Sequence, residues 1–227
     1  MYTLKPILAA IVFMAGYVSA SALPEASSNI AQRQNLVPLS FGNAEWIWTD
    51  EEVGGDAPIG SRGFRYQIIN PSPFILPICL TLAVAADNEY DLYVNGFNIG
   101  NDFELFETDS AFEDADIYNV PLNAEGQNII AINATNGLLP TTSGLEDVPN
   151  PAGLIVTGII TFSTGLQEVL ISNSTWLTLA APTPANFFEA TFNDAAWVPA
   201  SDQGMDGVSP WGATTIVPNN VIGCLNF

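Results

Sequence analysis

An acidic and an amide side chain follow each other at Asp87-Asn88, directly after the apolar run from Leu80 to Ala86. An apolar run of this length that ends in polar residues is typical of a buried strand. The strand would deliver a carboxylate and an amide to one edge of a sheet, where they could bind a ligand. The alternative is that the pair only closes a turn by bonding to its own backbone, a common role of Asp and Asn.

A hairpin is expected next to this pair. Two strand-like segments, residues 91–94 and 97–100, flank Asn95-Gly96. A two-residue type I′ turn needs positive φ at both central positions, and Asn-Gly tolerates that best. The hairpin would present Tyr90, Tyr93 and Asn95 near the carboxylate and the amide.

The rest of the chain predicts an all-β fold. Short segments rich in β-formers alternate with turns rich in Gly and Pro, and no stretch has a capped helical stripe. The expected strands are residues 44–48, 63–69, 117–120, 126–133, 154–162 and 168–172, with a long loop at 137–151. This succession predicts an antiparallel β-sandwich or jelly roll that forms one domain over residues 41–218.

The N-terminus has the organisation of a secretory signal peptide. Lys5 precedes an apolar core at residues 7–18, and small residues follow at 19–22. That core is too short to span a membrane as a helix. We therefore expect a signal peptide at 1–20, a flexible lead-in at 21–40, a tail at 219–227, and a secreted protein that is extracellular or in the cell wall and does not insert into membranes.

Charge and composition restrict the function. The 24 acidic and 4 basic residues give a formal net charge of −20. Repulsion then disfavours nucleic acid and anionic membranes, and favours a cation or a neutral polymer as partner. The chain has no histidine, and its one lysine, Lys5, leaves with the signal peptide. His-activated nucleophiles and Schiff-base chemistry are therefore excluded, and we predict a protein that is not an enzyme.

Secretion gives meaning to the cysteines and to two glycosylation motifs. An oxidising compartment favours a disulfide between Cys79 and Cys224 over a pair of buried free thiols. The sequons Asn133-Ala-Thr135 and Asn173-Ser-Thr175 are predicted glycosylation sites.

Acidic and aromatic residues offer two further candidate features. The loop at residues 101–116 could hold a second calcium ion, but its spacing is not that of an EF-hand, and a solvated loop is the favoured interpretation. Its acidic members are Asp102, Glu104, Glu107, Asp109, Glu113, Asp114 and Asp116. Trp46, Trp48, Trp176 and Trp197 are expected in the core, whereas Trp211 is left open between core and exposed sugar platform.

The segment A-D-N-x-Y-x-L-Y-V-N-G-x-x-x-G at residues 86–100 resembles the galactose-binding-domain-like β-sandwich modules of glycoside hydrolases. It is most similar to the calcium-dependent rhamnose-binding modules attached to α-L-rhamnosidases. Further family-like pieces follow in the same order at residues 44–48, 126–132, 151–154, 171–176, 192–197 and 210–212. The resemblance covers most of the predicted domain but includes nothing of a catalytic helical barrel.

The resemblance implies a calcium ion that contacts sugar hydroxyl groups. Carried over residue by residue, its protein ligands are Asp87, Asn88, Asn136 and the carbonyl of Pro151, and Tyr90 joins Asp87, Asn88 and Asn136 as a sugar-binding residue. Calcium binds 6–8 oxygens of these kinds. The segment from Gly137 to Asn150 departs from the family, in which this connection is short, and makes Asn133 a competing ligand.

Two functions remain after these arguments. One is a secreted, lectin-like, non-catalytic module that binds an extracellular glycan or cell-wall polysaccharide, with calcium, and recognises rhamnose- or galactose-type sugars. The other is a structural or adhesive extracellular protein that keeps the sandwich without a sugar site. In the second case the segment from Gly137 to Asn150 would fill the edge at Asp87.

Overall fold

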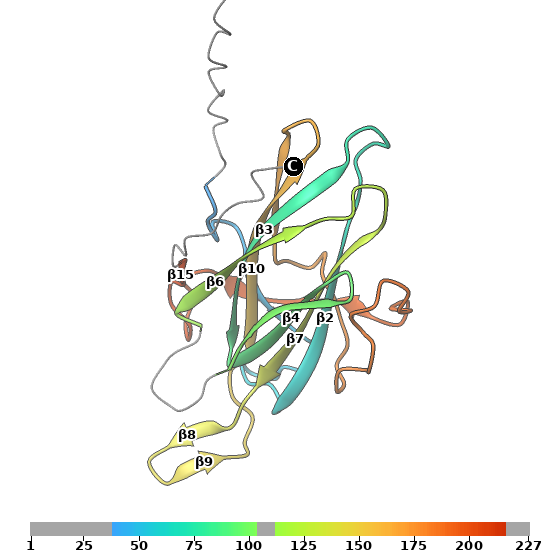
Figure 1. Cartoon of the computed structure of the whole chain (residues 1–227). Coiled ribbons are helices and arrows are strands. Elements are labelled where there is room, and N and C mark those ends of the chain that lie inside the picture. Colours follow the sequence, from blue (N-terminus) through green and yellow to red (C-terminus); the bar gives the residue numbers. More distant parts are fainter. Residues whose placement is uncertain (1–37, 104–111, 217–227) are drawn as a thin grey trace, which may run out of the picture. The chain divides into compact units, whose positions relative to one another are not determined.

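Two β-sheets packed face to face form the computed structural model of the chain, which describes residues 38–103 and 112–216 (Figure 1). The first sheet has the strand order β14-β1-β10-β3-β6-β15, with β11 beside β10. The second has the order β13-β12-β2-β7-β4-β5, and β8 and β9 form a separate ribbon. The predicted all-β sandwich is confirmed, and the described residues contain no helix.

The strands have the following bounds. The first sheet consists of β1 (Glu45–Trp48), β3 (Pro77–Asp87), β6 (Asp114–Pro121), β10 (Gly153–Phe162), β11 (Gln167–Ile171), β14 (Ser201–Met205) and β15 (Thr215–Ile216). The second consists of β2 (Gly60–Ile68), β4 (Glu89–Val94), β5 (Phe97–Asp102), β7 (Asn128–Asn136), β12 (Leu177–Thr178) and β13 (Val198–Pro199). The ribbon pairs β8 (Leu139–Thr141) with β9 (Gly144–Glu146).

One strand pair departs from the predicted antiparallel arrangement. The short β15 runs parallel to β6, with Thr215 opposite Asp114. All other pairings between the named strands are antiparallel.

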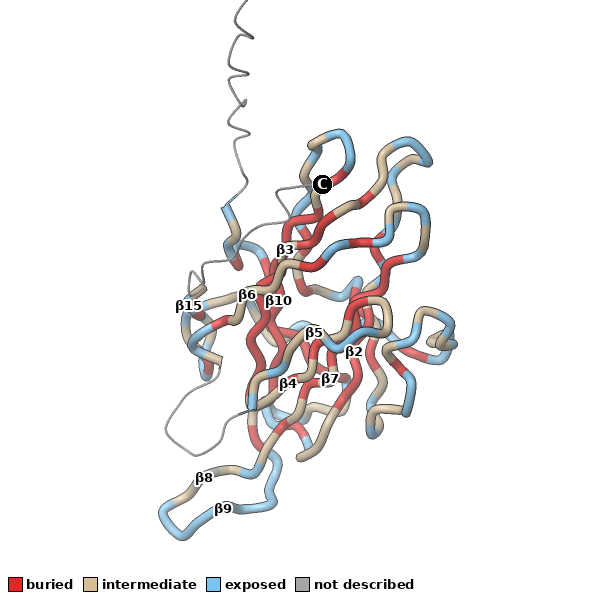
Figure 2. Tube along the Cα trace, viewed as in Figure 1, coloured by how far each residue is buried: buried red, intermediate tan, exposed pale blue. Residues whose placement is uncertain are grey.

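The central strand β3 is buried on both faces. Leu80, Leu82 and Val84 point between the two sheets, into the main core. Ala83 and Ala85 point to the other side, where a second cluster around Trp46 and Trp211 covers them. Figure 2 shows the resulting band of buried residues along β3 and β10. A strand with both faces covered appears in the sequence as a continuous apolar run, because neither face needs polar side chains.

The tryptophans all lie in the interior. Trp46, Trp48 and Trp176 are fully buried, and Trp197 and Trp211 are 7% and 6% exposed. The core prediction is confirmed for the first four, and the open question for Trp211 is resolved in favour of the core.

The predicted hairpin turn is confirmed at Asn95-Gly96, where φ is 53° and 86°. The Asn95 side chain also stabilises the neighbouring strand. Its Oδ1 accepts the Ile129 N–H at 2.9 Å, and its Nδ2 donates to Asn128 Oδ1 at 2.9 Å. Asn95 is therefore engaged in holding β4 against β7, away from the end of β3.

Several predicted features end elsewhere than expected or lie outside the described residues. β7 extends to Asn136, because it pairs with β2 along its whole length and with β4 from Ile130 to Thr135. The expected loop at 137–151 contains the ribbon β8–β9. The signal peptide, most of the lead-in, the C-terminal tail and residues 104–111 of the acidic loop are outside the described ranges. No helix in the described ranges is long and apolar enough to cross a membrane.

The predicted disulfide remains a prediction. Cys79, in β3, is 3% exposed. It is not a free thiol, because the described residues contain no free cysteine. Its expected partner, Cys224, lies outside the described residues.

Candidate functional site

Three strand ends meet at one corner of the sandwich. β3 ends at Asp87, which lies opposite Gly153 at the start of β10. The Asn88 N–H then donates to the carbonyl of Thr135 at 2.8 Å, next to the end of β7 at Asn136. Strand pairing thus brings together the four predicted calcium ligands: Asp87, Asn88, Asn136 and Pro151. We call these four residues the Asp87 corner.

The carboxylate of Asp87 is held by a buried indole. Asp87 is 8% exposed, and its Oδ2 accepts the N–H of Trp211 Nε1 at 2.8 Å. Trp211 in turn stacks on Trp46, with ring centroids 4.6 Å apart. A Cβ at Gly153 would lie 2.7 Å from Trp46 and 2.9 Å from Trp211, so only glycine fits below the two rings. The packing of the first sheet therefore fixes the direction of the carboxylate.

The side chain of Asn88 ties the corner to the ribbon. Its Oδ1 accepts the N–H of Gly137 at 2.6 Å, a contact between residues 49 positions apart. The peptide bond between Asp87 and Asn88 is cis. Both side chains make contacts far away in the sequence, which a pair that only closes a local turn would not need.

The amide of Asn136 is completely buried but only half satisfied. Its Nδ2 donates to the carbonyls of Ala57 at 3.0 Å and Asn150 at 3.3 Å, and makes a longer contact to Pro58. Its Oδ1 has no hydrogen-bond partner among the described residues. A buried carbonyl oxygen without a partner is uncommon and calls for an explanation. Because Nδ2 is held by these carbonyls, Oδ1 is left as an unused acceptor and is a candidate ligand for a cation.

The inserted segment does not separate Asn136 from Pro151. Asn150 exchanges backbone hydrogen bonds with Ala57 at 2.8 and 3.2 Å, and its Nδ2 donates to the carbonyl of Gly137 at 3.1 Å. Both ends of the insertion are therefore fastened at the corner. Between them the ribbon β8–β9 projects outward (Figure 1), and residues 142–149 are exposed.

The chemistry of the corner suits calcium more than a transition metal. No group of three or more His, Cys, Asp or Glu side chains in the described residues could hold a metal. The corner offers one carboxylate, two amide oxygens and the carbonyl of half-buried Pro151. Hard cations accept such oxygens and complete their shell with water or ligand hydroxyl groups.

The competing ligand Asn133 lies elsewhere. It sits inside β7, where Thr183 Oγ1 donates to its Oδ1 at 2.5 Å and its Nδ2 makes a 3.5 Å contact with Asp91 Oδ2. Those contacts occupy the side chain on the outer face of the second sheet. Asn133 is therefore not part of the corner, and its engaged side chain also argues against its use as a glycosylation site. The other sequon asparagine, Asn173, lies in a turn beside exposed residues, and its glycosylation remains a prediction.

The structure corrects the expectation that Tyr90 contacts a sugar. Tyr90 is 2% exposed, and its hydroxyl lies 2.9 Å from both Asp116 Oδ2 and the hydroxyl of Tyr118. Burial, followed by the neighbouring Tyr118 and Asp116, raises the pKa of Tyr90. Burial also raises the pKa of Tyr118 to about 12. The pair of tyrosines is thus a hydrogen-bonded part of the core.

Two contributions to the corner were missed by the sequence analysis. Trp211 orients the carboxylate from 124 residues away, and the Ala57–Asn150 bridge supports Asn136. The only signal for Trp211 was its membership of a family-like piece.

Comparison with known proteins finds similarity to an enzyme and to a lectin. No family model matches the chain. Its sequence is similar to an α-L-rhamnosidase from Streptomyces avermitilis, with 26% identity over 174 residues, which are 76% of this chain and 16% of the enzyme. The structure of that enzyme in complex with L-rhamnose aligns with a TM-score of 0.64 and 25% identity, over 80% of this chain and 16% of the enzyme chain.

A fungal lectin is also similar. The apo form of Pleurotus ostreatus lectin aligns with a TM-score of 0.65 and 35% identity, over 77% of this chain and 45% of the lectin chain. A lectin from the same fungus in complex with GalNAc aligns with a TM-score of 0.66 and 31% identity, over 80% and 49%. The chain thus spans less than half of the lectin and a small part of the enzyme. These matches confirm the resemblance to a galactose-binding-domain-like module of the kind found in rhamnosidases.

Proposed function

We propose that this chain is a secreted, non-catalytic carbohydrate-binding protein that recognises a neutral sugar with the help of calcium at the Asp87 corner. The observation that carries the proposal is the buried Oδ1 of Asn136, which has no hydrogen-bond partner among the described residues and belongs to the same corner as Asp87 and Asn88. A bound Ca²⁺ would supply a partner for this oxygen and a positive charge for sugar hydroxyl groups.

The residues of this chain position such a site without a rearrangement. Trp211 holds the carboxylate of Asp87, and Gly137 holds the amide of Asn88. The three carbonyls around Asn136 Nδ2 fix the orientation of its amide. Binding then costs little side-chain entropy, because the ligating groups are ordered beforehand.

Charge and similarity narrow the ligand. A chain with net charge −20 repels acidic polysaccharides, which leaves neutral ones. The similar lectin was solved with GalNAc and the similar rhamnosidase with L-rhamnose. We therefore take rhamnose- and galactose-type sugars of an extracellular glycan or cell-wall polysaccharide as the first ligands to examine.

Titration calorimetry on the full mature chain tests the proposal. Wild type should bind Ca²⁺. It should bind L-rhamnose or GalNAc at the corner when calcium is present, and EDTA should abolish this binding. Asp87→Asn removes the charge yet keeps an acceptor for Trp211, so it should abolish calcium-dependent binding in a folded protein. Asp202→Asn makes the same charge change at an exposed position in β14 and should bind as wild type does.

Two results would overturn the proposal. One is a wild-type protein that shows no calcium binding, and the other is an Asp87→Asn variant that binds calcium and sugar normally. A folded chain that binds no glycan under either condition would instead support a structural or adhesive role.

A further inference from the structure

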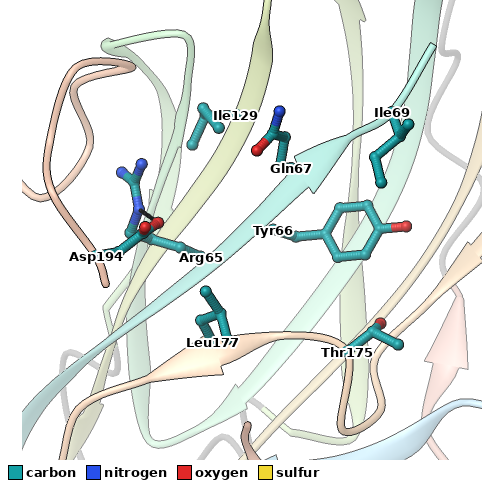
Figure 3. A pocket seen from close by; sticks show the side chains of 8 residues that line it. All are labelled: Arg65, Tyr66, Gln67, Ile69, Ile129, Thr175, Leu177 and Asp194. Atoms are coloured by element: carbon teal, nitrogen blue, oxygen red, sulfur yellow. Dashed lines mark hydrogen bonds and ion pairs between the residues drawn. The ribbon is translucent and has the colours of Figure 1, made fainter. Parts of the chain in front are cut away.

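A notch opens on the second sheet where β12 leaves β2. β12 pairs with β2 only at Phe64 and Arg65, whereas β2 continues to Ile68. Past this point a hollow of about 350 Å³ lies beside the edge of β2 (Figure 3). Ligand sites of proteins generally measure about 300–1,000 Å³, so the hollow is large enough for one small molecule.

One end of the notch is polar and rigid. Arg65 is 2% exposed, and its Nε donates to Asp194 Oδ2 at 2.8 Å. Its Nη1 also donates to the carbonyls of Phe187 and Glu189. The Asp194 side chain is 33% exposed, so the carboxylate faces the notch as well as the guanidinium. Figure 3 shows this ion pair at one end of the hollow, with the exposed Gln67 side chain on the same strand.

The remaining lining is mostly apolar. Leu177 and Ile129 contribute aliphatic side chains, and the ring of Tyr66 lies at the end opposite the ion pair (Figure 3). Tyr66 is held there by Trp176, with ring centroids 5.3 Å apart. Thr175 adds a hydroxyl whose proton is donated to Asn173 Oδ1 at 2.6 Å, so that its oxygen remains an acceptor.

This combination defines the chemistry of the ligand. Asp194 and Gln67 at one end, and the Thr175 hydroxyl near Tyr66, suit the hydroxyl groups of a ligand, and the aliphatic and aromatic walls suit C–H faces. The net charge of −20 disfavours an anionic ligand. A cationic ligand is also disfavoured, because Arg65 already neutralises the carboxylate of Asp194. A neutral pyranose has hydroxyl groups and apolar ring faces on one small molecule.

We infer that the notch is a second binding site for a neutral sugar, separate from the Asp87 corner and independent of calcium. Gly60 lies opposite Asn136 at the corner, and Tyr66 lies six positions further along β2. At about 3.3 Å per residue the two sites are about 20 Å apart. A single polysaccharide that reaches both sites gains from effective concentration, so the chain should bind polymers far more tightly than monosaccharides.

Nuclear magnetic resonance titration of the full mature chain, produced without N-glycans, tests the inference. The methyl glycosides of galactose, GalNAc, L-rhamnose and glucose are added in EDTA, in an Asp87→Asn background that silences the corner. At least one glycoside should cause saturable shifts of the Gln67 side-chain amide and of residues around Thr175. The double variant Gln67→Ala, Thr175→Val should bind it about tenfold more weakly, since it loses two hydrogen bonds.

The control is Gln203→Ala, the same change in β14 of the other sheet, which should leave the affinity unchanged. Absence of shifts at the notch with all four glycosides overturns the inference. So does a double variant that retains its affinity, or a Gln203→Ala variant that loses it equally. The proposal of calcium-dependent binding at the corner is tested separately, in the protein that keeps Asp87, with and without calcium. Either site can therefore fail its test while the other passes.

Discussion

Replacement of Asp87 should destabilise the protein as well as disable its corner. Asp87 is 8% exposed and Trp211 is 6% exposed, and their hydrogen bond is 2.8 Å long. In Asp87→Ala the buried indole N–H loses its acceptor. An unsatisfied buried donor costs about 1–3 kcal/mol, and hydrogen bonds to charged groups are at the upper end. We expect the free energy of unfolding to fall by about 2–3 kcal/mol in EDTA.

The conservative variant separates the hydrogen bond from the charge. Asp87→Asn presents an amide oxygen to Trp211 and should cost about 1 kcal/mol or less. Urea unfolding followed by tryptophan fluorescence measures both variants, and Asp147→Ala, an exposed acid in the insertion, should stay within about 0.5 kcal/mol of wild type. Equal losses in Asp87→Ala and Asp87→Asn would refute the role of the indole contact. Added calcium should then stabilise wild type and neither variant, because only a protein that binds the ion gains from it.

Three further outcomes follow from the packing and the pKa shifts. Gly153→Ala should lower the melting temperature, because its Cβ would lie within 3 Å of two buried indoles, at a cost of about 1–3 kcal/mol; a wild-type melting curve would contradict this. Glu52→Gln should raise the melting temperature at pH 7 and leave it unchanged near pH 4, because burial and then Asp56 raise the Glu52 pKa, so that ionisation above pH 4.5 opposes folding. Absorbance titration should show Tyr118 ionising near pH 12, with stability lost as pH rises from 10 to 12, because the unfolded chain releases this proton first. A Tyr118→Phe variant with the same alkaline unfolding profile would count against that assignment.

The sequence correctly predicted the turn and the strand whose conformation depends only on residues close together in the chain. The Asn95-Gly96 turn requires positive φ, and only a few residue types provide it cheaply. The run from Leu80 to Ala86 is apolar throughout because both faces of β3 are covered. These features follow from short segments, so the sequence alone was sufficient.

The orientation of Tyr90 was also available from the sequence but was overlooked. Side chains alternate along a strand, so Tyr90 must share a face with Leu92 and Val94. Both of those are buried in the main core, and Tyr90 lies with them. Its hydroxyl is satisfied inside the protein by Asp116, so it has no surface to offer a sugar.

Contacts between distant segments could not be predicted in the same way. Trp211 reaches Asp87 across 124 positions, and Asp194 reaches Arg65 across 129. No period or turn signal in either segment identifies its partner. Both functional hypotheses depend on such contacts, since one holds the carboxylate of the corner and the other forms the polar end of the notch.

The insertion favours one of the two functions that the sequence left open. A structural protein was expected to fill the edge at Asp87 with residues 137–150. The structure fastens only the two ends of this segment, through Gly137 and Asn150, to groups at the corner. The middle is directed outward as the ribbon β8–β9, whose residues 142–149 are exposed instead of packed against the corner. Burial of Leu145, which is 54% exposed, would have offered a hydrophobic gain for closing the edge. The ribbon stays exposed instead, and no donor among the described residues reaches Oδ1 of Asn136, as a ligand-binding corner requires.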